Sequence, residues 1–94
     1  MNQIKEVKKM EEKRIGVIAH YYGHLGVGII KIEAEGIKVG DTLHFKGHTS
    51  DFQQTVDSMQ VEHKDVQEAK VGDLVGAKVN EHVREHDEVF KVIA

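Results

Sequence analysis

The segment Lys38-Val39-Gly40-Asp41-Thr42-Leu43 recurs nearly unchanged as Lys70-Val71-Gly72-Asp73-Leu74-Val75, 32 residues further along the chain. In each copy the glycine can adopt a positive φ without steric cost, and the following aspartate can hydrogen-bond its own backbone. A weaker third version is His86-Asp87-Glu88-Val89-Phe90, in which histidine replaces glycine. Gly-Asp pairs also mark turns in many unrelated β proteins. The repeat nevertheless predicts a turn followed by a strand at three places, as in a small all-β domain.

Length and composition restrict the class of protein. A chain of 94 residues with 39% hydrophobic content suffices for one domain with one modest core. Its apolar runs fall short of the ~18 residues that a membrane-spanning helix needs, so we expect no membrane association. The first residues lack the apolar centre of a secretion signal, and the chain has no cysteine. These features predict a cytoplasmic protein.

The charge is divided unevenly along the chain. Residues 1–14 carry five basic and three acidic groups, so they contribute +2 to the net charge of −3 and the remainder carries −5. Nonspecific nucleic-acid binding requires Lys and Arg to neutralise phosphates. The acidic body therefore argues against a general nucleic-acid coat protein and leaves room only for a localised contact.

Alternation of apolar and polar residues predicts strands throughout the body. In the first of them Ile15, Val17 and Ala19 are expected to share one face, and a phase shift near Asp57-Ser58 predicts a β-bulge. The expected strands are 15–21, 25–33, 41–48, 51–63, 75–79 and 89–93. We predict a closed antiparallel β-barrel of six to seven strands over residues 14–94, preceded by a polar tail or short helix at residues 1–13.

Six motifs occur in a characteristic order. They are Gly16-Val17, Gly26-Val27-Gly28-Ile29-Ile30, Ile37-Lys38-Val39-Gly40-Asp41, Val56-Asp57-Ser58-Met59-Gln60, Ala69-Lys70-Val71-Gly72-Asp73-Leu74-Val75-Gly76 and Asp87-Glu88-Val89. In this order they resemble the second, β-barrel domain of translational GTPases such as elongation factor Tu. The resemblance covers about residues 14–93. It implies a barrel of the translation-protein type and a stand-alone elongation-factor-like protein.

The parts of a translational GTPase that handle nucleotide are missing from the sequence. It has no Gly-x-x-x-x-Gly-Lys-Ser/Thr loop, and Glu62-His63-Lys64-Asp65 only faintly imitates a guanine-reading motif. We therefore expect no GTP binding and no cofactor. In the family, an Asn and an Arg of this domain help to hold the aminoacyl end of tRNA, but Leu74 and, approximately, Val79 occupy those places here. Aminoacyl-end recognition is in doubt for that reason.

Six of the seven histidines form pairs spaced four residues apart: His20 with His24, His44 with His48, and His82 with His86. On a helix this spacing would place two imidazoles beside one metal ion. Along a strand four residues span ~13 Å, so we expect no metal site and predict surface or partner-contacting histidines. Their titration near neutral pH suggests pH-sensitive binding.

The sequence gives no context for a catalytic nucleophile. Ser50 and Ser58 lack a Gly-x-Ser-x-Gly elbow, and the acidic residues around Arg84 are typical of a solvated loop. We therefore predict that the chain is not an enzyme.

Two functions remain. The first, implied by the resemblance, is a non-catalytic module of translation that contacts tRNA or ribosomal RNA through a limited patch, predicted at Lys46, His48, Arg84 and His86. The second is a protein–protein adaptor that binds no nucleic acid, favoured by the acidic body. Its dock would be a sheet face or edge such as residues 26–30, although close strand packing also explains the glycines there.

Overall fold

A computed structural model describes residues 11–93, and it contains strands and turns but no helix in that range. No helix there could cross a membrane, because none is present. The expected tail or helix at residues 1–13 lies largely outside the described residues, and Glu12 and Lys13 already belong to the first strand. The strands are β1 (Glu12–Tyr22), β2 (Val27–Ile32), β3 (Ile37–Lys38), β4 (Thr42–Lys46), β5 (Asp51–Thr55), β6 (Met59–Val61), β7 (Lys64–Val66), β8 (Glu68–Ala69), β9 (Leu74–Lys78) and β10 (Glu88–Val92).

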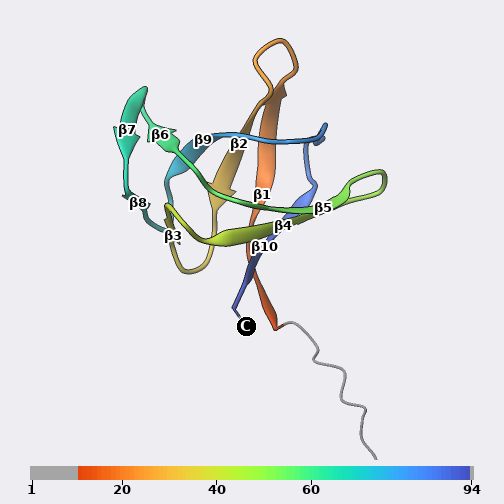
Figure 1. Cartoon of the computed structure of the whole chain (residues 1–94), viewed down its shortest axis with the longest axis horizontal. Helices are drawn as coiled ribbons and strands as arrows, with labels where there is room; N and C mark the ends of the chain where they lie inside the picture. Colours follow the sequence, from red (N-terminus) through yellow and green to blue (C-terminus); the bar gives the residue numbers. More distant parts are fainter. Residues whose placement is uncertain (1–10, 94) are drawn as a thin grey trace, which may run out of the picture.

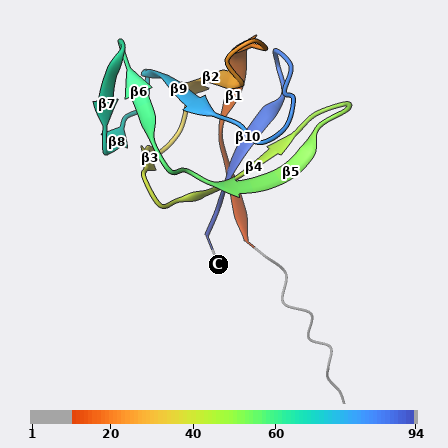
Figure 2. The ribbon, with the colours of Figure 1, turned by 45° about the horizontal axis from the view of Figure 1, so that its top comes forward.

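Eight of these strands form one strongly curled antiparallel sheet in the order β5-β4-β10-β1-β2-β9-β6-β7, and β3 pairs with β8 in a small second sheet (Figure 1). The β6–β7 and β4–β5 hairpins lie at opposite ends of the curl (Figure 2). The long β1 pairs with β2 on one side and β10 on the other, with irregularities at Arg14/Gly16 and Ile18/His20. A Cβ on Gly16 would overlap the Lys31 carbonyl, so glycine permits the close approach of β1 and β2.

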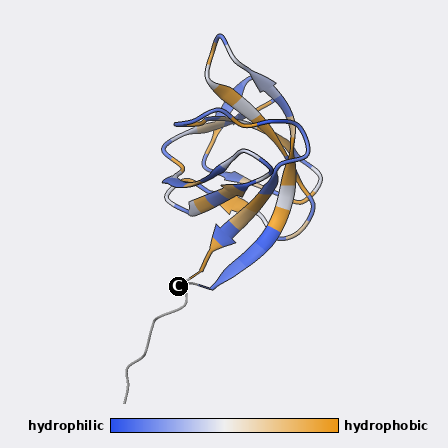
Figure 3. Ribbon diagram, turned by 90° about the vertical axis from the view of Figure 1, so that its right-hand side faces the viewer, coloured by the Kyte–Doolittle hydropathy of each residue, from blue (hydrophilic) through white to orange (hydrophobic). Residues whose placement is uncertain are grey.

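The core lies inside the curl and contains Ile, Leu, Val, Phe, Met and Ala side chains. Phe45 of β4 stacks on Phe52 of β5 with ring centroids 5.0 Å apart. Hydrophobic and hydrophilic residues alternate along the strands, while β1 begins with a hydrophilic stretch (Figure 3). In β4 Leu43 and Phe45 point inward, which agrees with the predicted period of two.

The three predicted turns share one geometry. Asp41, Asp73 and Asp87 each accept, through Oδ2, the backbone amide three residues earlier, at 2.8, 2.9 and 2.9 Å. Each aspartate amide also donates to the carbonyl of that same residue, at 3.0 Å. The preceding residue has φ of 100° at Gly40, 96° at Gly72 and 76° at His86. The prediction that His86 replaces a glycine in a third copy is therefore confirmed.

The sheet does not close into a barrel among the described residues, so the all-β prediction is confirmed but the closed barrel of six to seven strands is not. Instead the side chain of Gln54, on edge strand β5, reaches the end of β9 and the segment that follows it. Its Nε2 donates to the Lys78 carbonyl at 2.8 Å, and its Oε1 accepts the Asn80 amide at 2.7 Å. The side-chain amide of Gln54 thus bridges β5 and β9, which do not pair with each other. We call the gap between these two strands the seam.

The expected strand 51–63 is interrupted. It divides into β5, a break at residues 56–58, and β6. Val56 and Met59 are both buried despite their opposite parity. The phase shift at Asp57-Ser58 therefore reflects the end of one strand and the start of another, where a bulge within one strand was predicted.

Candidate functional site

The four residues predicted for RNA or partner contact lie on two loops that touch each other. Lys46 ends β4 and His48 follows it, while Arg84 and His86 lie in the loop before β10. Arg84 Nε donates to Thr49 Oγ1 at 3.0 Å, which ties the second loop to the first. The structure therefore brings the predicted residues to one end of the sheet, although they are 38 residues apart in sequence between Lys46 and Arg84.

The charge of these two loops does not suit phosphate. Residues 46–51 and 81–88 hold two basic residues, Lys46 and Arg84, against five acidic ones, a net of −3 with histidine neutral. Lys46 is opposite Asp51 on β5 and Glu88 on β10 in the strand register. Such a surface repels a polyanion, because affinity for nucleic acid comes mainly from uncompensated Lys and Arg.

Members of the histidine pairs contact residues outside their own pairs. Within residues 11–93 no group of three or more His, Asp or Glu residues is arranged to hold a metal ion. His20 Nδ1 lies 3.1 Å from Glu85 Oε2, and His82 packs on Tyr21 with ring centroids 4.5 Å apart. His44 does not face His48; it lies between two carboxylates.

His44 lies between two carboxylates and contacts one with each ring nitrogen. Its Nδ1 is 2.8 Å from Glu12 Oε2 and its Nε2 is 2.5 Å from Asp51 Oδ1, with its side chain only 13% exposed. Burial lowers the pKa of His44, but the hydrogen bonds to Asp51 and Glu12 outweigh it, so the pKa is raised above its usual value of 6.5. The site joins β1, β4 and β5.

Side chains with catalytic potential are engaged elsewhere. The Ser50 hydroxyl is buried and donates to the backbone carbonyl of His82 at 3.3 Å, so it faces an acceptor that cannot remove its proton. The buried Asp87 carboxylate accepts the Arg84 amide in a turn. Neither group is paired with a base in the way that nucleophilic catalysis requires.

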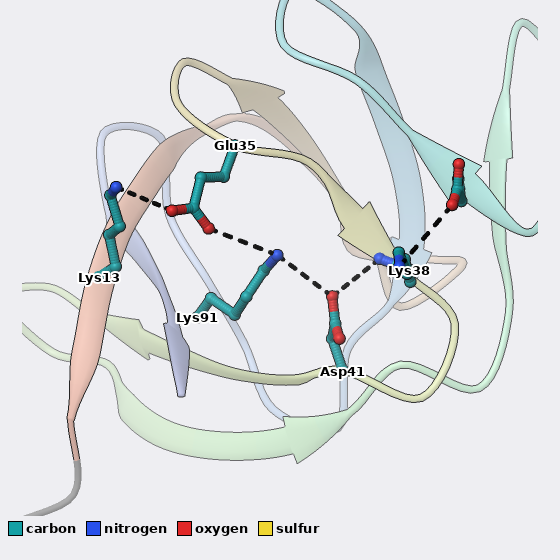
Figure 4. A network of polar contacts seen from close by, with 6 residues as sticks. Lys13, Glu35, Lys38, Asp41 and Lys91 are labelled. Carbon is teal, nitrogen blue, oxygen red and sulfur yellow. Dashed lines mark hydrogen bonds and ion pairs between the residues drawn. The ribbon is translucent and has the colours of Figure 1, made fainter. Parts of the chain in front are cut away.

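A hollow of about 460 Å³ beside β3 and β8 is bordered by charged side chains. Lys91 Nζ lies between Glu35 and Asp41, at 3.8 and 3.5 Å, and Lys13 Nζ contacts Glu35 at 2.8 Å (Figure 4). Lys38 Nζ is 4.0 Å from Glu68 on the other border. Three of the lysines at this hollow, Lys13, Lys38 and Lys91, thus face carboxylates of the chain, which leaves them less available to an ionic ligand.

A second hollow of about 450 Å³ is apolar and lies on the outer face of β2 and β9, between the β1–β2 and β6–β7 hairpins. We call it the hairpin groove. Its apolar side chains include Tyr22, Leu25 and Leu74, exposed by 49%, 64% and 54%. The groove is lined by Tyr22, Leu25, Val27, Ile29, Gln60, Glu62, His63, Leu74 and Gly76. A solvated sheet face is normally polar, so exposed apolar side chains gathered in a hollow indicate a binding surface.

The sequence pattern located this groove only in part. Residues 26–30 were a predicted dock for an adaptor, and Val27 and Ile29 of that segment do line the groove. Gly28 instead faces the core, where a Cβ would lie 3.3 Å from Val83 Cγ2. The contribution of Leu74 could have been suspected from the consecutive apolar residues at 74 and 75, which break the period of two.

Solved structures identify the class to which this fold belongs. The chain is similar to the C-terminal domain of a Geobacillus thermoleovorans protein described as a U32 peptidase, with a TM-score of 0.78, 19% identity, and coverage of 94% of this chain and all of that one. A selenomethionine form of the same domain gives a TM-score of 0.77 at 18% identity, covering 82% of this chain and 96% of that one. At these identities the similarity shows a shared fold.

One curated protein is similar at the level of sequence. It is an uncharacterized protease of Methanocaldococcus jannaschii, 39% identical over 83 residues. The match covers 87% of this chain, but the chain spans only about a fifth of the length of that protease. No protein-family model matches the sequence.

These similarities overturn the resemblance to the second domain of elongation factor Tu. They also overturn the function derived from it, a translation-associated module that contacts tRNA or ribosomal RNA, because the proteins found to be similar are peptidase-type. The motifs that suggested the resemblance are chiefly turns capped by aspartate and followed by strands. Such turns satisfy a general requirement of short-stranded β domains and do not specify a ligand.

Proposed function

We propose that this chain is a binding module without catalytic activity of its own, which docks on the peptidase part of a U32-type protein. The observation that carries the proposal is the extent of the archaeal match: 87% of this chain corresponds to only 20% of the protease. A domain of this kind thus accompanies a much larger remainder. This is the adaptor function, with the peptidase part as the protein partner.

The hydrogen bonds of the Ser50 hydroxyl and the His44 ring support a non-catalytic role. Ser50 faces a carbonyl, and His44 is held by carboxylates on both nitrogens. A histidine in that position has no free nitrogen with which to take a proton from a nucleophile. The cytoplasmic location stays a prediction.

Two measurements test the proposal. The isolated chain should not hydrolyse fluorescent casein or gelatin, and sustained hydrolysis that survives further purification would contradict the non-catalytic role. For docking, the archaeal protease is produced whole, with its matched 83 residues replaced by the corresponding part of this chain. Hydroxyl-radical labelling read by mass spectrometry then compares each side chain in this chimera with the isolated chain. Docking predicts that some exposed side chains become protected in the folded chimera.

Among the described residues we consider two surfaces for this docking. One is the hairpin groove. The other is the pair of loops with Lys46, His48, Arg84 and His86, for which partner contact stays a proposal. The loops are hydrophilic and have internal contacts of their own, such as that between Arg84 and Thr49. The labelling experiment distinguishes the two surfaces because they involve different strands.

A further inference from the structure

We infer that the hairpin groove receives an apolar side chain from the peptidase part, and that Gly76 keeps the groove open for it. The inference rests on the proposed function and adds to it the docking surface and the chemistry of what fills it. It is carried by the geometry of three adjacent strands, β2, β9 and β6, and by the kind of residue at each outward position.

The outward positions of these strands have an unusual composition. In β2 the inward residues Gly28, Ile30 and Ile32 are buried, so Val27 and Ile29 point outward and are only half-buried. In β9 Leu74 points outward beside them. Outward side chains on a one-sided sheet are expected to be polar. Lys31, Lys78 and Gln60 follow this expectation. Val27, Ile29 and Leu74 do not, and they form an apolar floor among these polar residues.

Gly76 lies at the centre of this floor. The strand register places it between Ile29 of β2 and Gln60 of β6. A Cβ added at Gly76 would lie 3.6 Å from Ile29 Cδ1, 3.7 Å from Val27 Cγ1 and 3.9 Å from the Gln60 carbonyl oxygen, which are ordinary contact distances. Gly76 also has no positive φ. Neither packing nor backbone conformation therefore requires glycine here.

Glycine in a strand interior is unfavourable, and it often marks a place where another group approaches the sheet closely. Gly16 and Gly36 differ from Gly76 in this respect, because a Cβ on either would overlap a neighbouring carbonyl within the chain. The missing side chain at Gly76 leaves a hollow that no side chain of residues 11–93 fills. We attribute it to a side chain supplied from outside.

The borders of the groove fit a protein partner. Tyr22 and Leu25 stand on one side, on the β1–β2 hairpin, and the β6–β7 turn forms the other side. That turn has positive φ at both Glu62 and His63, and Gln60 Nε2 donates to Asp65 Oδ1 across the hairpin at 3.0 Å, which fixes the border. An apolar floor with an aromatic and apolar border on one side and a polar border on the other suits a protein–protein contact, in which an apolar centre meets a polar rim.

We assign the occupant of the groove to the peptidase part because most of the related archaeal protease lies outside the segment that matches this chain. In the archaeal protease about four fifths of the sequence lies outside the matched segment. Interfaces between domains of one chain typically bury ~600–1,500 Å², so a domain this small uses a substantial part of one face. Among the described residues the hairpin groove is the hollow whose lining is apolar and exposed.

The test uses the chimera and side-chain labelling described above. Tyr22, Leu25 and Leu74 should each be labelled several-fold less in the chimera than in the isolated chain. Val71 is the matched control, since it is 56% exposed but borders the hollow beside β3 and β8. Its labelling should not change.

Gly76→Val then fills the hollow. The isolated variant should fold as well as the original chain, and in the chimera it should restore labelling of Tyr22 and Leu25 to the level of the isolated chain. Leu74→Ser provides a second variant if Gly76→Val does not fold, and Val71→Ser is the control. Restored labelling with either groove variant but not with Val71→Ser supports the inference.

The two proposals fail in different ways. If no side chain is protected in a folded chimera, the proposed docking function is wrong and this inference falls with it. If protection appears only on the loops at 46–50 and 82–87, or if both groove variants leave the protection intact, docking stands and the hairpin groove is wrong.

Discussion

Gly47 packs directly against the buried carboxylate of Asp87, so that the β4–β5 loop lies on the aspartate that shapes the turn before β10. Asp87 is only 4% exposed, and a Cβ on Gly47 would overlap its side chain. The same carboxylate accepts the Arg84 amide at 2.9 Å. The conformation of one loop therefore depends on the absence of a side chain in the other.

Gly47→Ala should destabilise the protein by about 1–3 kcal/mol, because displacement of the buried Asp87 carboxylate would break its hydrogen bond with the Arg84 amide. The free energy of unfolding in urea measures the effect. Gly23→Ala is the control: its Cβ would come no closer than 3.6 Å to Tyr21 Cε2, and we expect little change there. Equal stabilities for the two variants would refute this role for Gly47.

His86→Gly should stabilise the protein by up to ~1 kcal/mol, since a side chain at positive φ is strained and glycine is not. His86 has φ of 76° in a turn whose other copies use Gly40 and Gly72. Thermal unfolding of His86→Gly and of the reverse change, Gly72→His, should shift the midpoint in opposite directions. A loss of stability with His86→Gly would contradict this prediction. It would show that contacts of the imidazole stabilise the protein by more than the positive φ destabilises it.

Gln54→Ala should cost about 1–2 kcal/mol, because two hydrogen bonds across the seam are lost together. The Asn80 amide, which donates to Gln54 Oε1, should also exchange its hydrogen with solvent faster. Gln53→Ala, at the neighbouring exposed position on β5, serves as the control. Unchanged exchange at Asn80 in the Gln54 variant would mean that the seam is held by other contacts.

The contact of His44 with Glu12 and Asp51 should make stability depend on pH. The pKa of His44 is raised above 6.5, so its stabilisation is complete below pH 6.5 and is lost as the pH rises through the folded-state pKa. The Asp51 carboxyl has its pKa lowered from 3.8 by the hydrogen bond to His44, so its contribution is present above pH 3.8 and is lost as the pH falls through the lowered value.

The stabilisation from this contact is therefore greatest between about pH 4 and 6.5, the limits set by the two usual pKa values. Urea unfolding from pH 4 to 9 measures it, and NMR of the His44 ring gives the titration directly. His44→Gln should remove most of the decline in unfolding free energy above pH 6.5. Asp51→Asn should make this decline smaller but not abolish it, because His44 still contacts Glu12. An identical pH profile in the His44 variant would contradict the prediction.

The turns and inward positions were predictable from sequence because each depends on local chemistry. Gly40-Asp41 and its copies specify their own turn geometry. The first residue adopts a positive φ, and the aspartate accepts a hydrogen bond from the amide three residues earlier. The face pattern of β1 was not predictable in the same way: Ile15 and Ile18 are buried while Ala19 is exposed, because irregularities in pairing shift the parity. Those shifts arise from neighbouring strands that are distant in sequence.

The contact between β5 and the end of β9 and the position of the hairpin groove also depend on residues that are distant in sequence. Nothing near Gln54 indicates that its amide will meet Lys78 and Asn80. Likewise Leu74 and Gly76 become one surface with Tyr22 and Leu25 only after β2 and β9 have paired. The sequence named Lys46 and Arg84 as parts of one contact patch, and whether they bind a partner stays a prediction. The acidic residues around Arg84 were visible in the sequence, but that they lie beside Asp51 of the other loop depends on how the strands pair.

The pairing of β1 with β10 has a consequence for how the chain folds. Glu12 lies opposite Val92, so one of the two ladders of the longest strand requires the last strand of the sheet. Contacts between such distant residues slow folding. During synthesis one edge of β1 stays unpaired until residues 88–92 have left the ribosome. The hydrophilic residues Glu12, Lys13 and Arg14 at its beginning are suited to that interval, because charged side chains on an exposed strand edge discourage pairing with other chains.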